Sequence, residues 1–418
     1  MARIPTRLWL LGAIALIVLG FAVLRVPNIA SRIDWRYEVW STYLRNWLDP
    51  VGPMPTPVPS TPLPSATPAP PTATAGVIPT ATATDLPLPA QVLLTAPEYE
   101  RQGINNCGPA TLAMTLHMYG WKGDQYDIAA IIKPIDKDRN VNPEELRYFV
   151  LNEAGWLRAE YRVAGDVHLL KRLLASKYPV IVEAATIIDP QDAAGPGDDL
   201  WAAHYLLITG YDDAAGTVTA HDPLRGPDRK IPYDTLMEDW KPFNYLYMVI
   251  YLPEDEQELS AILGPDWDAD ANRLRALSMA EEAIASSPKD AFAWFNRGSA
   301  LVYFERYAEA SQAFDQAFTL GLPQRMTRYQ FWPFVAYYNA DRIDYLLEIT
   351  ENTYKVINGQ YSEEALLWHG YGLLRKGDIQ GASASWNKAL SVHPRYCDAE
   401  RAINEFVAFT HDLAGCSP

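Results

Sequence analysis

A long segment with almost no charge divides this chain into two unequal parts. Residues 53–89 are rich in Pro, Thr, Ala and Ser, and they contain no charged residue before Asp85. A segment of this composition cannot bury enough apolar surface to form a core. At about 3.1 Å per residue it would reach on the order of 100 Å. The sequence therefore predicts a disordered, extended stalk over residues 51–91, with a short part before it and a large part after it.

The short part begins with a hydrophobic run. Residues 8–24, LWLLGAIALIVLGFAVL, are uncharged and mostly apolar, and they follow Arg3 and Arg7. As a helix rising about 1.5 Å per residue, this run nearly crosses a hydrocarbon core of about 30 Å. We interpret residues 1–30 as an uncleaved signal anchor, a transmembrane helix. The alternative is a cleaved signal peptide, whose best cleavage site, after Ala30, fits the small-residue pattern poorly.

A second helix is predicted over residues 31–50. Its apolar and aromatic residues recur at helical spacing: Ile33, Tyr37, Trp40, Leu44 and Trp47. Aromatic and Arg side chains of this kind suit a juxtamembrane helix that lies near the membrane surface, and a short coiled-coil-like dimer seam is the alternative. Because Pro/Thr stalks are commoner outside the membrane than inside, we expect the globular domains after the stalk to be extracytoplasmic.

Length, charge and cysteine content limit the function of the whole chain. Its 418 residues exceed one ordinary domain, and its formal net charge of −16 argues against a nucleic-acid partner, since phosphate binding needs clustered Lys and Arg. Three cysteines, Cys107, Cys397 and Cys416, cannot form a disulfide framework. The last two could pair in an oxidising compartment, which would leave Cys107 free.

Residues 257–418 carry an internal repeat. Small and aromatic residues recur at a spacing similar to that of tetratricopeptide repeats, in two clear copies: Trp294, Gly298, Ala310, Phe314 and Ala317, then Gly370, Ala382, Trp386, Ala389 and Pro394. A weaker copy precedes them, and residues 324–360 form a degenerate one. Stacked helix pairs of this type make a curved surface that commonly holds another protein. The alternative is a helical cap on the preceding domain with no partner of its own.

The middle part contains a cysteine at the predicted start of a helix. Asn106 is a good N-cap, Pro109 is tolerated in a first turn, and an apolar face follows: Ala110, Leu112, Ala113, Leu116 and Tyr119. Cys107 would then lie in the first turn, where unsatisfied N–H groups and the helix dipole favour the nucleophilic thiolate. The alternative is a buried, inert cysteine.

A nucleophilic cysteine needs a base and a group that orients the base. The segment 204–223 predicts a hairpin centred near Asp213, in which His204 and Asp222 are directly opposed and lie on one face. The imidazole could then bond the carboxylate with one nitrogen and the thiol with the other. A register slip of one residue would place the side chains of His204 and Asp222 on opposite faces of the sheet. In that case the roles of His221 or Asp213 would have been misread.

Two groups are candidates for an oxyanion hole, which acyl transfer also requires. The backbone N–H of Cys107 is one donor, and the side-chain amide of Gln102 is the other. Asn105 and Asn106 compete with Gln102 for this role.

These motifs together resemble a known family. Gln102, NCGPATLAM at 106–114, HYLLITGYD at 204–212 and HDP at 221–223 look like the bacteriocin-processing (double-glycine), papain-like cysteine peptidases, and more closely their stand-alone branch. The resemblance covers roughly residues 92–253. It implies Cys107 as nucleophile, His204 as general base, Asp222 as its orienter and Gln102 as oxyanion donor, although Gln102 is one residue closer to the cysteine than in many relatives. No phosphate loop or transporter segment accompanies it, so the leader-cleaving role of the transporter-fused members does not carry over.

The expected fold is α+β: a papain-like domain over residues 92–256, then an all-α repeat domain over 257–418. Helices are predicted at Tyr126–Ile132, Pro143–Glu153 and Val167–Ser176. Strands are predicted at Pro179–Ala184, His204–Tyr211, Thr217–His221 and Tyr245–Leu252. The loop 189–199 is interpreted as solvated, with a lid or a cation site through Asp192, Asp198 and Asp199 as alternatives. No His/Cys spacing supports zinc, and we predict no metal and no cofactor.

We therefore interpret the chain as a membrane-anchored, exported cysteine peptidase that hydrolyses amides through a thioester acyl-enzyme. Its substrate, a peptide or protein, would bind at Cys107, and a protein partner would bind the repeat surface. Two alternatives use the same residues: a catalytically inactive peptide-binding adaptor, and an acyltransferase that passes the acyl group to an amine.

Overall fold

The computed structural model describes residues 27–50, 54–57, 87–356, 359–396, 398–399 and 402–403. The hydrophobic run 8–24, most of the predicted stalk, and both Cys397 and Cys416 lie outside the described residues. None of the helices within these ranges is both long enough and apolar enough to cross a membrane. The chain divides into two units: residues 1–51 with 188–200, and residues 52–187 with 201–418.

Among its described residues, the first unit contains helix α2 (Pro27–Leu48) and the loop 188–200, which includes a 3₁₀ turn at Pro190–Asp192. Helix α2 includes the predicted juxtamembrane segment, and the aromatic stripe of that segment is solvent-exposed: Ile33, Tyr37, Trp40, Leu44 and Trp47. Asn46 Nδ2 donates to the carbonyl of Ala194 at 2.9 Å, and Arg36 pairs with Asp192 at 3.0 Å. Asp198 accepts a hydrogen bond from the backbone N–H of Leu200. The acidic side chains Asp192 and Asp198 are thus bonded to protein groups.

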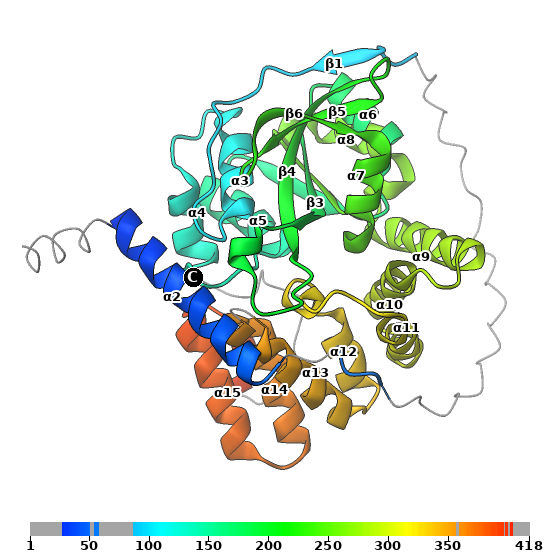
Figure 1. Ribbon diagram of the computed structural model, residues 1–418. Coiled ribbons are helices and arrows are strands. Elements are labelled where there is room, and N and C mark those ends of the chain that lie inside the picture. Colours follow the sequence, from blue (N-terminus) through cyan, green and yellow to red (C-terminus); the bar gives the residue numbers. More distant parts are fainter. Residues whose placement is uncertain are drawn as a thin grey trace, which may run out of the picture. The chain divides into compact units, whose positions relative to one another are not determined.

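The second unit is built around an antiparallel sheet of seven strands (Figure 1). The strands are β1 (Gln91–Leu93), β2 (Arg158–Arg162), β3 (Val180–Ile187), β4 (Trp201–Asp212), β5 (Thr217–Asp222), β6 (Gly226–Pro232) and β7 (Tyr247–Tyr251). Their order is β2-β7-β3-β4-β5-β6, and β1 pairs with β4. Every pairing is antiparallel.

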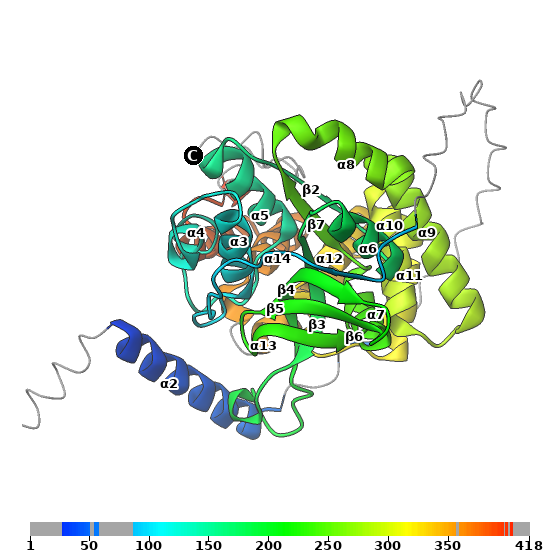
Figure 2. The ribbon, with the colours of Figure 1, turned by 90° about the horizontal axis from the view of Figure 1, so that it is seen from above.

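Helices cover both faces of this sheet because its central strands are apolar on both sides. On β4, Tyr205 and Leu207 join the core beneath α3 (Cys107–His117), α4 (Gln125–Ile132) and α5 (Pro143–Phe149). Leu206 and Ile208 point the other way, toward α6 (Val167–Ala175), α7 (Tyr233–Trp240) and α8 (Glu256–Leu263). This alternation follows from the two-residue period of a strand. Figure 2 shows α3, α4 and α5 grouped together, apart from α6 and α8.

The predicted helices and strands of this domain are confirmed, with bounds that differ by a few residues. Helix α5 ends earlier than predicted, in a π-helical turn over Val150–Ala154. Three strands, β1, β2 and β6, and helix α7 were not predicted. Strands β2 and β6 lie at the two ends of the strand order, and their sequences, RAEYR and GPDRKIP, are polar. Edge strands are commonly charged, so they lack the apolar pattern that identifies a strand from sequence.

The C-terminal region is entirely helical among its described residues. Its helices are α9 (Ala269–Ser286), α10 (Ala291–Tyr303), α11 (Tyr307–Leu320), α12 (Trp332–Asn339), α13 (Ile343–Lys355), α14 (Glu363–Arg375) and α15 (Ile379–Val392). The fold class is therefore α+β, followed by an all-helical region, as the sequence predicted.

Two helix pairs in this region share one packing detail. A Cβ added to Gly298 on α10 would collide with the ring of Phe314 on α11, and one added to Gly370 on α14 would collide with the indole of Trp386 on α15. In both pairs the aromatic residue follows the glycine by the same number of residues. Glycine is required at these positions because the aromatic ring of the second helix occupies the space that a side chain would fill.

Polar contacts join the helical region to the sheet domain within the second unit. Asn142 Nδ2 donates to Glu364 Oε1 at 2.7 Å, Asn296 Nδ2 donates to the Lys241 carbonyl at 2.9 Å, and Gln330 Nε2 donates to a backbone carbonyl of the 3₁₀ turn Lys241–Phe243 at 2.7 Å. A cavity of about 480 Å³ also lies at this junction. The sheet domain and the helical region thus belong to the same compact unit.

Candidate active site

Cys107 is the first residue of α3 and is half-buried, so part of its surface remains accessible. Asn106 occupies the N-cap position, as predicted, but its side chain does not cap the helix. It donates instead to Gln125 Oε1 at 2.9 Å. The N–H groups at the start of the helix therefore have no side-chain cap, and the backbone of Gly108 forms a hydrogen bond with the sulfur of Cys107.

The register between β4 and β5 differs from the predicted one. We expected His204 directly opposite Asp222, but the structure pairs Leu207 with His221, so that Asp222 falls opposite Leu206. His204 lies two residues further along β4. Because side chains alternate with a period of two, this offset keeps His204 and Asp222 on the same face as diagonal neighbours.

A bulge in β4 is responsible for this shared face. Near the turn, Gly210 pairs with Thr219, and the register shifts by one between Gly210 and Ile208. Extending the turn register without that shift would place His204 and Asp222 on opposite faces of the sheet. The single extra residue in β4 thus brings the two side chains together.

Asp222 is held as a buried, ionised acceptor. Its Oδ1 accepts from His204 Nε2 at 2.8 Å and from the backbone N–H groups of Leu224 and Arg225, both at 2.9 Å. Arg229 Nη1 is 3.5 Å from Oδ2. Burial raises the pKa of Asp222, but the hydrogen bond and charge of His204, with the two backbone donors, lower it more, to about 2. The carboxylate therefore orients the His204 ring and fixes a proton on Nε2.

His204 also forms a hydrogen bond with the thiol of Cys107, through its other ring nitrogen. Burial raises the pKa of the Cys107 thiol, but the hydrogen bond from His204, the charge of His204 and the backbone of Tyr205 and Gly108 lower it further, so the net shift is downward. Burial lowers the pKa of His204, whereas its bonds to Asp222 and Cys107 raise that pKa to about 9. These opposite shifts favour a thiolate–imidazolium pair near neutral pH.

The three candidates for the oxyanion hole differ in their partners. Asn105 Nδ2 donates to the carbonyl of Asp136 at 2.9 Å, and the Asn106 amide is bonded to Gln125. Gln102 is anchored through its backbone N–H, which donates to the carbonyl of Pro223 at 2.9 Å, and its buried side-chain Oε1 has no hydrogen-bond partner among the residues that the structure describes. Of the three amides, only that of Gln102 is not committed to the surrounding loops.

His221 and Asp213, the alternatives if the hairpin register had slipped, have partners outside the triad. His221 is buried, its Nδ1 accepts from the backbone N–H of Asp228 at 3.3 Å, and its ring meets Tyr99 edge to face. Asp213 is at the hairpin turn and pairs with Lys171 at 2.7 Å. Neither side chain contacts the pair formed by His204 and Cys107.

Gln125, the first residue of α4, was not identified from the sequence. Its Oε1 accepts from Gly103 N at 2.6 Å and from Asn106 Nδ2, while its Nε2 donates to Glu100 Oε1 at 2.8 Å and to the Arg101 carbonyl at 2.9 Å. This single buried amide thus clamps the loop that enters α3. Its only sequence signal is a glutamine directly after a helix-capping aspartate.

We expect Gln125→Ala to loosen that loop and to lower the free energy of unfolding by about 2–4 kcal/mol, because buried donors and acceptors lose their partners. Thermal and urea denaturation measure this loss, and the alkylation rate of Cys107 should change with it. Gln257→Ala, at an exposed position of α8, is the matched control and should leave both unchanged. If the two variants had the same free energy of unfolding, Gln125 would not hold this loop in place.

Comparison with known proteins identifies a family for part of this chain. Residues 85–248 match the family described as Peptidase C39-like. A solved structure described as a C39-like peptidase from Bacillus anthracis is 17% identical, and the match covers 38% of this chain and 96% of that one with a TM-score of 0.30. No curated protein matches the chain.

Residues 85–248 are thus a C39-like peptidase domain, and that family is one of cysteine peptidases. The resemblance stated from sequence, over residues 92–253, is confirmed at this level. No comparison identifies tetratricopeptide repeats in the helical region that follows.

Proposed function

We propose that the C39-like domain is an active cysteine peptidase in which Cys107, His204 and Asp222 form the catalytic triad. The observation that carries this proposal is their convergence: Asp222 bonds His204, and His204 bonds Cys107 at the start of α3. These residues come from a helix and two strands that are far apart in the sequence. A buried structural cysteine has no need of an imidazole oriented by an ionised carboxylate.

The reaction begins when the Cys107 thiolate attacks the scissile carbonyl carbon. The resulting oxyanion accepts hydrogen bonds from the Cys107 backbone N–H and from the Gln102 side chain. The His204 imidazolium donates its proton to the leaving amine, which departs and leaves a thioester on Cys107. His204 then removes a proton from water, the hydroxide attacks the thioester, and the carboxylic acid product leaves with the thiol regenerated.

We also propose that the protein is attached to a membrane by residues 8–24, with its globular domains outside the cytoplasm. The exposed aromatic stripe of α2 supports this proposal, since Trp and Tyr side chains favour the membrane–water interface. The helical region would act as a tetratricopeptide-type surface for a protein partner. Its support is the equivalent glycine–aromatic packing in α10–α11 and α14–α15.

The pH dependence of Cys107 alkylation tests the proposed ion pair. The thiolate reacts and the thiol does not, so the alkylation rate should rise with an apparent pKa below the ordinary value of 9.0. The rate of hydrolysis should rise with pH over the same range as the alkylation rate. It should fall again near pH 9, as His204 loses its proton. Iodoacetamide kinetics with peptide mapping of the label, and a peptide-library digest, measure the rise and the fall.

The same measurements separate the alternatives. If the pKa of the Cys107 thiol were unshifted and no peptide were cleaved, the protein would be a catalytically inactive, peptide-binding adaptor. Amide products that increase with added amine, in place of carboxylic acids, would assign an acyltransferase.

A further inference from the structure

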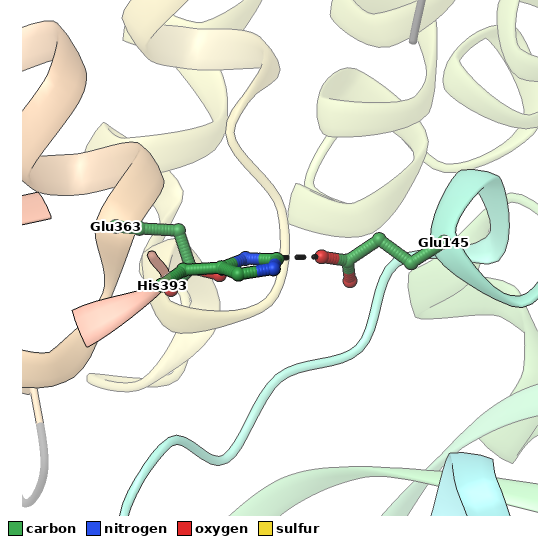
Figure 3. A group of neighbouring side chains, drawn as sticks. All are labelled: Glu145, Glu363 and His393. Carbon is green, nitrogen blue, oxygen red and sulfur yellow. Dashed lines mark hydrogen bonds and ion pairs between the residues drawn. The ribbon is translucent and has the colours of Figure 1, made fainter. Parts of the chain in front are cut away.

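Three electron-pair donors that do not belong to the triad converge at the junction of the C39-like domain and the helical region. Glu145 lies on α5, Glu363 is the first residue of α14, and His393 follows α15. His393 Nδ1 is 3.2 Å from Glu363 Oε1 and 3.9 Å from Glu145 Oε1. Figure 3 shows the imidazole and the Glu145 carboxylate pointing toward each other from different parts of the chain.

Glu363 and His393 are buried and Glu145 is mostly buried: the exposed fractions of the side chains are 13% for Glu145, 3% for Glu363 and 10% for His393. The imidazole also forms a hydrogen bond with the backbone of Ile131. When Nε2–H of a neutral His393 ring donates to the backbone of Ile131, Nδ1 carries a lone pair that faces the carboxylates of Glu145 and Glu363. A ring N–H bonded to a backbone carbonyl is the usual arrangement of a histidine that binds a metal.

Glu363 supplies a second observation. Its Oε1 faces His393, but its Oε2 is buried without any hydrogen-bond partner in the described part of the chain. Glu145, by contrast, uses its Oε2 to accept from the backbone N–H of Asn142 at 2.7 Å, which leaves its Oε1 directed at His393. An unpaired carboxylate oxygen at a buried position is costly unless the group takes up a proton or binds a cation.

Within the described residues, the two neighbouring cations, Lys133 and Arg328, form no hydrogen bond or ion pair with Glu363, although the charges of both act on it. Lys133 Nζ lies closest to the carbonyl of Asp138, at 3.2 Å, and Arg328 Nη2 lies 3.6 Å from the Asp138 carboxylate. Glu364, beside Glu363, adds another buried carboxylate, which accepts from Asn142. Within the described residues, the hydrogen bonds and the ion pair of these two cations thus go to Ile135 and Asp138, and not to Glu145, Glu363 or His393.

The spacing of these acceptors fits a metal ion. Bonds of 2.0–2.1 Å in a tetrahedron place neighbouring ligand atoms roughly 3.3 Å apart, and the three ligand atoms here all lie within 4.8 Å of one another. The cavity of about 480 Å³ is lined by Glu145 and His393, so it offers both an access route and room for a water ligand.

We propose that Glu145, Glu363 and His393 bind a divalent transition-metal ion of the zinc class, with water from the cavity as a further ligand. No metal was predicted from the sequence, because these ligands lie in two different domains and form no spacing motif. The ion would tie α5 of the C39-like domain to α14 and the end of α15. Since an ion bound only by the folded junction stabilises it, the site is structural.

Titration of the full-length protein with Zn²⁺ tests this proposal. The experiment uses the Cys107→Ala variant, so that the active-site thiol does not bind zinc, after removal of metals with a chelator. We expect one equivalent of Zn²⁺ to bind by calorimetry and to raise the melting temperature. Glu145→Gln, Glu363→Gln and His393→Gln should each weaken binding by about 10- to 100-fold or more.

His369→Gln is the matched control, because His369 is another histidine of the helical region and bonds Thr350, not this cluster. It should bind zinc as the parent does. X-ray absorption of the zinc-loaded parent should report one imidazole with oxygen ligands and no sulfur, a result that does not depend on the folding of any variant. Absence of stoichiometric binding, zinc–sulfur ligation, or unchanged affinity in the three variants would overturn the proposal.

Discussion

Cys107→Ala should reduce peptide hydrolysis by about 10⁴-fold or more, to the rate of the uncatalysed reaction plus binding effects. The reason is that no other group can form the thioester: His204 and Asp222 act only through the sulfur in the proposed mechanism. The folded state should survive, because Cys107 is half-buried and small. Single-turnover assays with a peptide that the parent cleaves give the measurement.

Two companions sharpen this test. Cys107→Ser keeps the shape and the hydrogen bond to His204 but replaces the thiolate by a poorly ionised hydroxyl, so it should be nearly as inactive. Cys397→Ala changes a cysteine outside the triad and should retain activity. Undiminished turnover by the Cys107→Ala protein would discard the peptidase assignment of this site.

Asp222→Ala should lower kcat/KM by about 10²- to 10⁴-fold, since His204 would lose both its orientation and the stabilisation of its charged form. It should also lower the free energy of unfolding by about 2–4 kcal/mol, because the backbone N–H groups of Leu224 and Arg225 would lose their acceptor beside buried His204. The pKa of His204 should fall from its raised value, which NMR titration of the ring can follow.

Asp222→Asn separates these two effects. Its carbonyl oxygen can still accept from the turn and from His204, so stability should be largely kept while the charge support for the imidazolium is lost. Asp213→Asn, at the exposed end of the same hairpin, should alter neither activity nor the His204 pKa. An Asp222→Ala protein with normal turnover and an unchanged His204 pKa would contradict the orienting role.

Elements with strong local patterns could be predicted from sequence. Helix α3 follows from Pro109 in a first turn and the apolar face after it, and the central strands β3, β4 and β7 follow from their β-branched and aromatic runs. The edge strands β2 and β6 could not be predicted in this way. Their polar sequences become strands only because an apolar neighbour offers them hydrogen-bond partners.

The candidate site could be predicted from the sequence to a similar degree. The residue types and the presence of a hairpin predicted that His204 and Asp222 belong together, but the register in which they meet depends on the bulge between Ile208 and Gly210. A bulge arises from how strands fit within a sheet, and its only local signal here is Gly210, since a glycine inside a strand often marks a bulge. The prediction of a shared face was right although the predicted pairing was wrong, because the error was two residues and the strand period is also two.

By itself, the sequence determined which segments can bury apolar surface, where a thiol meets the start of a helix, and which side chains can act as base and orienter. These properties depend on residues close together in the chain, so their periodicity and spacing record them. The tertiary structure alone decided that Gln125 clamps the loop before Cys107, and that Glu145 meets Glu363 and His393 across two domains. Such meetings depend on packing between distant segments, which no local spacing encodes.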